Sequence, residues 1–330
     1  MSKSTWVKIG IAVLLLLAIV SLAVGLYWSR EPDAFDVRAQ AAKEAQTHQQ
    51  KVVIGTTTTA TLIHLVEVML DKPGGYFSND VSPPAVWLDN MPNWEYGVLL
   101  QVRDLTRSMR NDISRSRSQS VEPVDLAKAE AHFNISPTTW VMPNAQSEYR
   151  DGITNLRSYL QHLANHQQEN AQFYARSDNL KAYLLVVEKR LGSLALRLSA
   201  SVEQRRINTD LGGDSAATQS TRGKSELLVK TPWLQVDDIF YEARGSTWAL
   251  VQILRAMQVD FADVLNKSNA NVSLEQIIRE LEAAQAPIYS PMVLNGAGFG
   301  LVANHSLEMA GYLSRANAAL IDLRTLLEGG

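Results

Sequence analysis

Polar and apolar positions divide this chain into one uninterrupted apolar run near its start and amphipathic segments after it. Residues 9–29 form a stretch of 21 residues without a charged side chain. A helix of that length rises about 31 Å, enough to cross the hydrocarbon core of a bilayer. The rings of Trp6, Tyr27 and Trp28 flank the run, at the depth that amphipathic rings favour in membranes. We therefore expect residues 1–30 to form a cytoplasmic tail and a single transmembrane helix.

A cleaved secretory signal is the alternative for this run, with the small residues Ser21 and Ala23 ahead of a cut. The run is longer than the apolar core of most signals, which favours an anchor. Positive charges nearly balance on its two sides, but Lys8 abuts the run whereas acidic residues closely follow Arg30. The positive-inside rule then favours an N-terminal tail in the cytoplasm and a periplasmic domain, anchored in the inner membrane.

Beyond the anchor, apolar residues recur at steps of three and four, the spacing of one face of a helix. Residues 31–55 hold few large apolar side chains, and we expect them to form an exposed helical stalk. Residues 56–330 are expected to form one helical domain. The expected helices lie near residues 62–72, 94–114, 147–206, 231–265, 273–281 and 309–327. The predicted fold class is all-α, a multi-helix bundle with long helices, and no segment reads as a convincing strand.

Turn-forming and polar stretches interrupt this pattern. The pattern from residue 147 to residue 206 would extend about 90 Å as one helix, so we expect a turn within residues 165–177. Residues 208–224 combine glycines with polar residues and are predicted to be disordered. The Thr-Pro pair at 231–232 is typical of a helix start, and Ser273 with Gln276 has the spacing of a capping box.

Two apolar stripes follow heptad-like steps, in residues 180–198 and 309–327. They could form a coiled-coil seam between two copies of the chain, which would give a homo-oligomer. In a domain with other helices available, such stripes are more simply the core faces of a bundle.

Composition supports a folded domain and excludes several kinds of chemistry. Hydrophobic residues make up 46% and charged residues 20% of the 330 residues, which is ample for a large core. A net charge of -3 argues against bulk nucleic-acid binding. The chain contains no cysteine, so disulfides, thiol catalysis and thiolate metal sites are excluded. No motif indicates a bound cofactor.

Residues 74–97 concentrate aromatic side chains among prolines and glycines. Because Pro83, Pro84 and Pro92 are incompatible with a continuous helix, we expect loop backbone to display the rings. This loop is either a lid that packs its rings on helix ends or a groove for a sugar or peptide. The residues that would contact a ligand in the groove are Tyr76, Asp80, Trp87, Asp89, Trp94 and Glu95.

Arginines recur at helical spacing after this loop. Arg103, Arg107, Arg110 and Arg117 lie along one side of the expected helix. Such a row could bind anionic headgroups or polymer, because each guanidinium offers paired donors to phosphate or carboxylate. More often, a row of this kind is solvated or pairs with acidic residues of a neighbouring helix.

Three groups of histidine and carboxylate residues have spacings that could gather metal ligands. His162, His166 and Glu169 could share one helix face, but the glutamate that follows the first histidine in zinc hydrolases is missing. Two further pairs read His-x-x-Glu, the reverse of the order in di-metal bundles. We assign no metal; the weak candidates are His64, Glu67, His305 and Glu308.

Five stretches of the sequence together resemble a known family. They are residues 70–76, 78–84, 173–176, 198–202 and 294–306. They look like membrane-anchored proteins of Gram-negative bacteria that are grouped as a domain of unknown function. The resemblance covers nearly the whole chain after residue 55 and implies one domain in an inner-membrane setting. It implies no reaction and no catalytic residues.

These observations predict a non-enzymatic envelope protein that scaffolds or binds a partner protein or a cell-wall polymer. The heptad faces, the arginine row and the lack of a catalytic grouping favour this function. The alternative is a metal-assisted or carboxylate-dependent envelope hydrolase that uses residues 74–97 as its substrate groove. Tight metal binding would favour the hydrolase, whereas a captured neighbour would favour the scaffold.

Overall fold

A computed structural model describes residues 3–116, 122–165, 171–207, 226–290, 292–298 and 300–328. Helices dominate these residues, which confirms the predicted all-α class. The α-helices are α1 (Lys3–Trp28), α2 (Val37–Thr47), α3 (Thr56–Asp71), α4 (Asn90–Ser108), α5 (Val124–Phe133), α6 (Ala145–Ala164), α7 (Ser177–Ser199), α8 (Val236–Asp260), α9 (Ala262–Lys267), α10 (Asn271–Ala283) and α11 (His305–Glu328). Shorter turns are η1 (Ala85–Trp87), the π-helical η2 (Met109–Ile113) and η3 (Trp233–Gln235).

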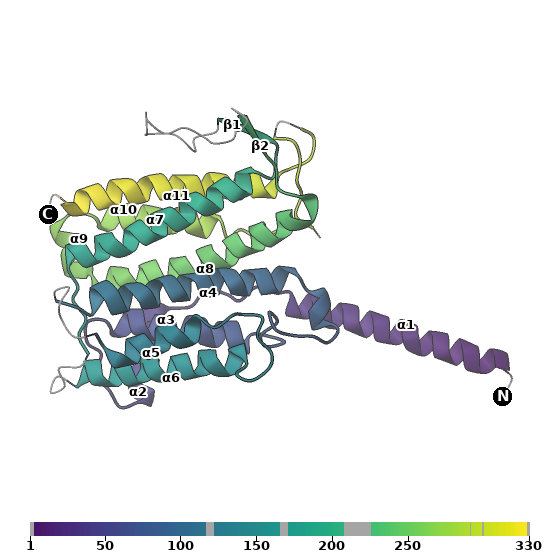
Figure 1. The fold of residues 1–330 in the computed structure, drawn as a ribbon, viewed down its shortest axis with the longest axis horizontal. Helices are drawn as coiled ribbons and strands as arrows, with labels where there is room; N and C mark the ends of the chain where they lie inside the picture. The colour runs from purple at the N-terminus through teal and green to yellow at the C-terminus, as the bar shows by residue number, and fades with distance from the viewer. Residues whose placement is uncertain are drawn as a thin grey trace, which may run out of the picture.

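Helix α1 projects from one end of a bundle of long helices (Figure 1). Within the described residues it is the one helix long and apolar enough to cross a membrane. Most of its large apolar side chains are exposed, because no other helix of the bundle runs beside it. The predicted apolar helix is therefore present, with a length and composition that suit a membrane anchor or a signal sequence.

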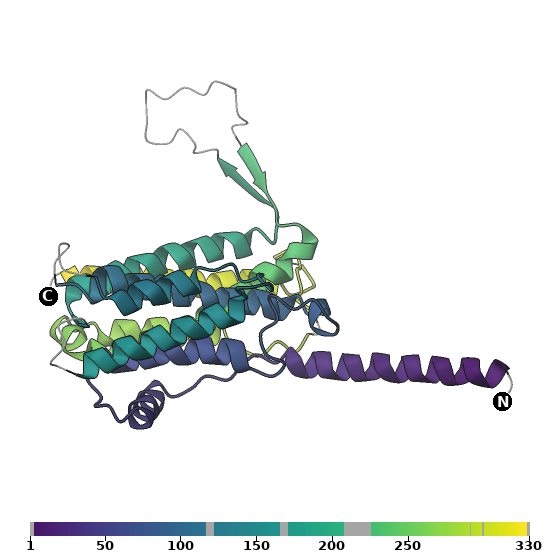
Figure 2. The same ribbon diagram turned by 60° about the horizontal axis from the view of Figure 1, so that its bottom comes forward.

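The long helices of the bundle run back and forth along its length (Figures 1 and 2). The connections after α3, α5, α7 and α10 lie at the end from which α1 projects. The connections after α4, α6 and α8 lie at the opposite end, together with the end of α11. We call these the α1 end and the far end of the bundle.

Helices α4 and α8 cross closely at the centre of the bundle, because two glycines face each other there. A Cβ atom on Gly97 would lie 2.1 Å from the carbonyl oxygen of Glu242, and one on Gly245 would lie 2.0 Å from the carbonyl oxygen of Trp94. The ring centroids of Trp94 and Trp248 are 5.1 Å apart at this crossing. Larger residues at either glycine would force the two backbones apart.

The two heptad-like stripes belong to α7 and α11, which pack against each other. Their apolar residues are buried in the core of a single chain, namely Leu180, Leu184, Val187, Leu191, Leu194 and Leu198 on α7 and Met309, Leu313, Ala316, Leu320, Leu323 and Leu327 on α11. These faces are therefore occupied within the chain and are not free to form a seam with a second copy.

The expected stalk forms a helix over part of its length, and one face of that helix is buried against the bundle and not exposed as predicted. Helix α2 packs against α3 and buries Val37, Ala41, Glu44 and Ala45. Alanine side chains are short enough for the two helices to lie close, so a stripe without large apolar residues still forms an interface.

The expectation of no strand also needs correction. Strands β1 (Gln204–Ile207) and β2 (Glu226–Val229) form an antiparallel pair, with Gln204 opposite Val229. Four residues are too few to produce a recognisable alternation of polar and apolar positions. The hairpin stands away from the bundle (Figure 2). The predicted disordered segment, 208–224, lies outside the described residues.

Helix boundaries differ from the predictions where proline or a cap was decisive. Helix α4 begins at Asn90, so Trp94 lies on a helix and not on a loop; Pro92 is in the first turn, where its missing N–H costs little. The predicted capping box of Ser273 with Gln276 is wrong, because α10 begins at Asn271 and Ser273 lies inside this helix. The predicted break between α6 and α7 is confirmed.

Candidate functional site

The junction between α1 and the bundle is the most elaborate polar and aromatic site in the described part of the chain. The connection from α3 to α4 covers the C-terminal end of α1, where the rings of Trp28 and Phe77 are 5.6 Å apart. Gly74 makes this approach possible, since its φ is +88° and a Cβ there would lie 2.7 Å from Trp28 Cγ. The backbone conformation and the space both require glycine at this position.

The buried ammonium group of Lys72, at the end of α3, holds this connection in place. The side chain of Lys72 is 1% exposed, and it pairs with the fully buried Glu95 at the start of α4. The same Nζ atom donates to the carbonyl oxygens of Met69 at 3.1 Å and Gly75 at 2.5 Å. It also lies 4.5 Å from the centre of the Phe77 ring. Lys72 therefore joins the end of α3 to the turn that follows it.

The carboxylate of Glu95 completes the arrangement from the other side. It accepts hydrogen bonds from the backbone N–H of Phe77 and of Ser78, both at 2.8 Å, and from the Ser78 hydroxyl at 2.5 Å. Burial raises the pKa of Glu95, while Lys72 and these donors oppose the rise. Burial lowers the pKa of Lys72 against the attraction of Glu95. Each charged group is stabilised by the other, because both are buried and no water could solvate either one if its partner were removed.

A second ion pair fixes the chain just after α1. Arg244 of α8 is buried, and its Nε and Nη2 atoms each donate to the Glu31 carboxylate at 2.6 Å. The guanidinium also donates to the carbonyl oxygens of Ala284 at 3.3 Å and Ala286 at 2.9 Å, at the end of α10. This one side chain therefore connects the exit of α1, α8 and α10.

Phe35 extends the same contact into the core. Its ring lies edge-on to His64 at 4.5 Å and to Trp248 at 6.1 Å. Trp28, Glu31 and Phe35 therefore attach the chain to the bundle at three successive points. The structure shows no free linker between α1 and the bundle among these described residues.

The aromatic residues proposed for a groove are not gathered around one. Tyr76 is buried, with its hydroxyl donating to the Pro137 carbonyl at 3.1 Å. Trp94 is fully buried at the crossing of α4 and α8, whereas Trp87 is 66% exposed beside α1. Asp80 is half-buried, and partial burial raises the pKa of its carboxyl against the pull of Lys72. This arrangement matches the alternative of a lid that packs its rings on helix ends.

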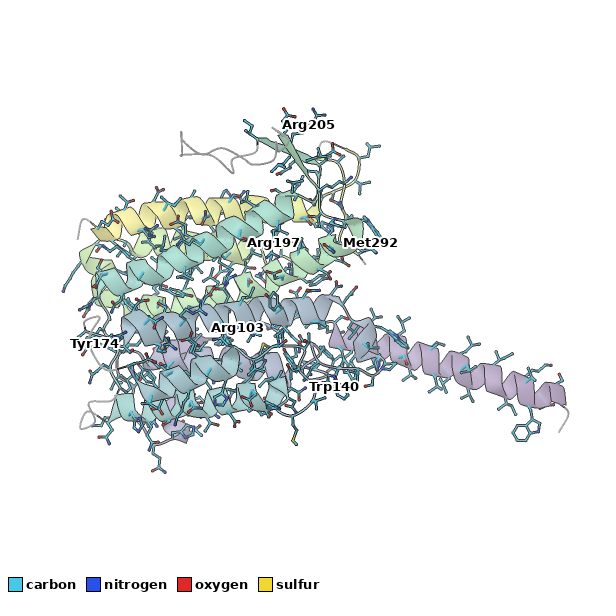
Figure 3. All side chains as sticks on the ribbon, in the orientation of Figure 1. Arg103, Trp140, Tyr174, Arg197, Arg205 and Met292 are labelled. Atoms are coloured by element: carbon cyan, nitrogen blue, oxygen red, sulfur yellow. The ribbon has the colours of Figure 1, made fainter. Side chains whose placement is uncertain are left out.

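The arginine row ties α4 to α5 where it is described. Arg103 donates from Nε to the Phe133 carbonyl at 2.7 Å and from Nη2 to the Ile135 carbonyl at 2.8 Å, so it caps the end of α5 at mid-bundle (Figure 3). Arg107 and Arg110 pair with Glu130 of α5 at 3.2 and 3.0 Å. Arg117 lies outside the described residues.

The two His-x-x-Glu pairs remain apart. His64 is 3.2 Å from the Glu67 carboxylate, which Arg157 also contacts at 2.6 Å. The His305 ring accepts a hydrogen bond from the backbone N–H of Leu294 at 3.1 Å and so helps to close the loop before α11. Figure 1 shows α3 and α11 on different sides of α8. The pairs therefore cannot share one metal ion in this fold.

The third predicted group is only partly described. His162 pairs with Asp125 of α5 at 2.8 Å, while His166 and Glu169 lie outside the described residues. Glu308, the remaining weak candidate, lines a cleft of about 290 Å³ together with His305 and Tyr312.

Sequence reasoning missed another group, formed by His132 of α5 with Glu148 and Asp151 of α6. Among the described residues it is the one group of three possible ligands whose atoms all lie within 4.8 Å of one another. His132 Nδ1 is 2.8 Å from the Glu148 carboxylate. No local motif could reveal it, because its members come from two helices that meet only in the folded chain.

Fold and junction together define a class of protein: a bundle of antiparallel helices attached directly to the end of an apolar N-terminal helix. The chain belongs to the family described as "uncharacterized protein conserved in bacteria" (DUF2333), which matches residues 1–330. The resemblance to a family of unknown function is thereby confirmed. No curated protein and no solved structure matches the chain.

Proposed function

We propose that this protein is a non-enzymatic envelope scaffold. Helix α1 anchors it in the inner membrane, and the bundle lies in the periplasm and holds a partner protein or a cell-wall polymer. The observation that carries this proposal is the direct attachment of the bundle to the end of α1. A scaffold needs such an attachment because it must present its partner at a fixed height and orientation over the bilayer.

The geometry at the junction opposes rotation of the bundle about α1. Glu31 is only three residues beyond the end of α1 at Trp28, and its partner Arg244 is itself held by α10. Rotation of the bundle about α1 would break a bidentate, largely buried ion pair, and such pairs are strong and geometrically specific. A flexible stalk would allow that rotation at little cost.

Further ion pairs between helices support a stiff bundle. Arg190 of α7 makes a bidentate pair with Asp104 of α4. Arg197 of α7 likewise pairs with Glu242 of α8. Each pair crosses an interface between separate helices and fixes their relative position, as partly buried bidentate pairs do. The charged groups thus stiffen the framework that would carry a partner.

In-cell capture tests the scaffold function. A photo-crosslinking residue is placed in the full chain at exposed positions away from α1, such as Val124, Val272 or Leu326. We expect a discrete protein or glycan adduct at one or more of them. The adduct pattern should change in Glu31→Ala and persist in Asp33→Ala, a matched loss of an exposed carboxylate two residues further on. Absence of any adduct at every position would count decisively against a binding function.

Membrane placement is tested independently. The chain has no cysteine, so Val272→Cys creates a single thiol on an exposed part of α10. We expect an impermeant thiol reagent to label it in spheroplasts, and mass spectrometry to find Trp6 still attached. Protection of the thiol would contradict the periplasmic domain, and loss of Trp6 would identify α1 as a cleaved signal.

The alternative, a metal-assisted hydrolase, is favoured by one observation, the group formed by His132, Glu148 and Asp151. Imidazole and carboxylate are suitable ligands for zinc or manganese. Calorimetric titration of the full chain with each metal decides the matter. Tight stoichiometric binding that disappears in His132→Ala, but not in His162→Ala, would replace the scaffold by the hydrolase.

A further inference from the structure

The α1 end of the bundle exposes large apolar side chains on all four of its connections. The connection after α3 exposes Val81, Val86 and Trp87; that after α5 exposes Trp140, Val141 and Met142; that after α7 exposes Trp233 and Leu234; and that after α10 exposes Tyr289, Met292, Leu301 and Val302. Soluble surfaces seldom gather so many large apolar side chains at one end.

Aromatic residues distinguish this end from the other. In the described part of the bundle the exposed tryptophans are Trp87, Trp140 and Trp233, at 66%, 62% and 72%, and each belongs to the α1 end. Among the described residues of the far end, the large apolar side chains exposed by its connections and helix starts are all aliphatic, namely Val52, Ile54, Val124 and Val272. Tryptophan and tyrosine prefer the interfacial layer of a bilayer, where one part of the ring is apolar and another is polar.

Hydrogen bonds join the four connections in two pairs, and the chain at the end of α1 contacts both pairs, through Phe77 and through Arg244. The Tyr76 hydroxyl donates to Pro137, which joins the connections after α3 and α5. The Asn295 side-chain amide donates to the Ser201 carbonyl at 3.0 Å, which joins those after α7 and α10. In Figure 3, Trp140 and Met292 both lie at the α1 end, whereas Tyr174 lies at the far end.

The depth of this surface follows from α1 itself. The uncharged stretch of α1 ends at Ser29, and Ser21 lies eight residues, or about 12 Å, further into it. Ser21 and Leu22 line a cleft of about 390 Å³ together with Trp87 and Leu88 of the bundle. The connection after α3 therefore lies beside the end of the uncharged stretch, which brings it to the membrane surface if that stretch spans the bilayer.

We propose that the α1 end of the bundle rests in the interfacial layer of the bilayer that α1 spans, as a second, monotopic membrane contact. The inference relies on the anchoring role of α1 in the proposed function. It identifies the occupant of this surface as lipid, because the surface is continuous with the lipid-facing side of α1. The bundle then stands on the membrane with its far end directed into solution.

Charges at this end indicate which force holds it there. Acidic residues outnumber basic residues at this end, since Arg30 and Lys230 are accompanied by Asp33, Asp80, Asp89, Asp237 and Asp238, so the end offers no positive patch to anionic headgroups. Contact with lipid is therefore driven by burial of apolar side chains and not by attraction to anionic headgroups. It should be insensitive to salt and to the content of anionic lipid.

Single-cysteine labelling of the full chain tests the proposal, since the sequence has no cysteine to remove. An environment-sensitive fluorophore is attached in Met142→Cys or Leu234→Cys at the α1 end, and in Val272→Cys at the far end. Phosphatidylcholine vesicles carry one of two quenchers, a lipid with a spin label near its headgroup for the bundle positions or a lipid with a spin label deep in its acyl chain for the anchor position. Leu16→Cys, within α1, reports insertion of the anchor. Helix α8, with 25 residues, separates the two ends by about 37 Å.

We expect blue-shifted emission and quenching at Met142 and Leu234, little quenching at Val272, and the same pattern when anionic lipid or salt is added. If Leu16 is quenched but Met142 and Leu234 behave like Val272, the bundle does not touch the bilayer and the inference fails while the anchor survives. If Leu16 is not quenched, α1 is not an anchor, and the proposed function fails with the inference.

Discussion

Removing the buried charge of Lys72 gives the sharpest test of how the junction is stabilised. In Lys72→Met, a side chain of similar length but no charge leaves the Glu95 carboxylate buried without its cation. Breaking a buried pair by removing one partner typically costs about 3–5 kcal/mol. Glu95 keeps its donors from Phe77 and Ser78, which places the expected loss of unfolding free energy near 3 kcal/mol, the lower end of that range.

A double-mutant cycle separates the pair from its surroundings. Glu95→Gln alone leaves the ammonium buried and should also cost about 3 kcal/mol. The double variant Lys72→Met with Glu95→Gln has no buried charge, and its amide oxygen can still accept from the backbone. We expect it to cost about 1–3 kcal/mol less than the sum of the two single variants.

Urea unfolding of the full chain in detergent micelles measures these changes, with tryptophan fluorescence as the signal because Trp94 adjoins Glu95. Arg150→Met is the matched control. It removes an ion pair of 2.7 Å to Asp71, the neighbour of Lys72, but both its side chains are more than half exposed. Its expected cost is about 0–1 kcal/mol. Equal costs for Lys72→Met and Arg150→Met, or strict additivity in the cycle, would refute the reasoning.

Three further predictions concern the bundle. Gly97→Ala should destabilise the protein by about 3 kcal/mol or more, because its Cβ would lie 2.1 Å from a carbonyl oxygen of α8. Gly192→Ala should instead stabilise α7 by about 0.5–1 kcal/mol, because the atom nearest to its added Cβ would be 3.7 Å away. Urea unfolding measures both changes. Arg103→Lys should cost about 1–3 kcal/mol by the same assay, since an ammonium cannot reproduce both bonds to the end of α5. Burial raises the pKa of Glu67, but hydrogen bonds from a nearby histidine and Arg157 outweigh it and hold that pKa below its ordinary 4.5. The stability that Glu67 contributes is therefore present above pH 4.5 and lost as pH falls through its folded pKa, so the stability difference from Glu67→Gln should shrink in acid.

Each of these predictions has an outcome that contradicts it. Similar stabilities for the two glycine variants would mean that α4 and α8 do not cross as closely as described. An Arg103→Lys variant as stable as the original protein would show that the bonds of Arg103 to the end of α5 do not stabilise the fold. The hypothesis that the arginine row binds an anionic ligand would then be favoured again. A stability difference for Glu67→Gln that stays constant down to pH 3 would mean that the pKa of this carboxyl is not lowered on folding.

Much of the fold was predictable because it depends on local patterns. The uncharged stretch of α1, the spacing of apolar residues along α7 and α11, and the break between α6 and α7 all act through neighbours within a few residues. The start of α4 was not predictable from proline alone, because Pro92 in a first turn is compatible with a helix, whereas the same residue in a helix interior is not.

The junction was predictable only in its parts. The sequence marks residues 72–75 as a helix stop and residues 74–97 as rich in aromatic rings. Which rings point inward depends on what packs against them: Trp94 meets Trp248 and is buried, whereas Trp87 lies beside α1 and stays exposed. Glu95 was noted as a possible ligand contact, but its partner lies 23 residues earlier, and no periodicity relates the two.

The amino-acid sequence by itself determines an apolar N-terminal helix, an all-α bundle and a chain without thiol chemistry, since these follow from composition and short-range spacing. Tertiary structure alone decides that Glu31 pairs with Arg244 across 213 residues, and that the connections after α3, α5, α7 and α10 expose apolar side chains at the end from which α1 projects. The physical reason is that ion pairs and shared surfaces depend on distance in space. Distance in space is set only when the helices pack.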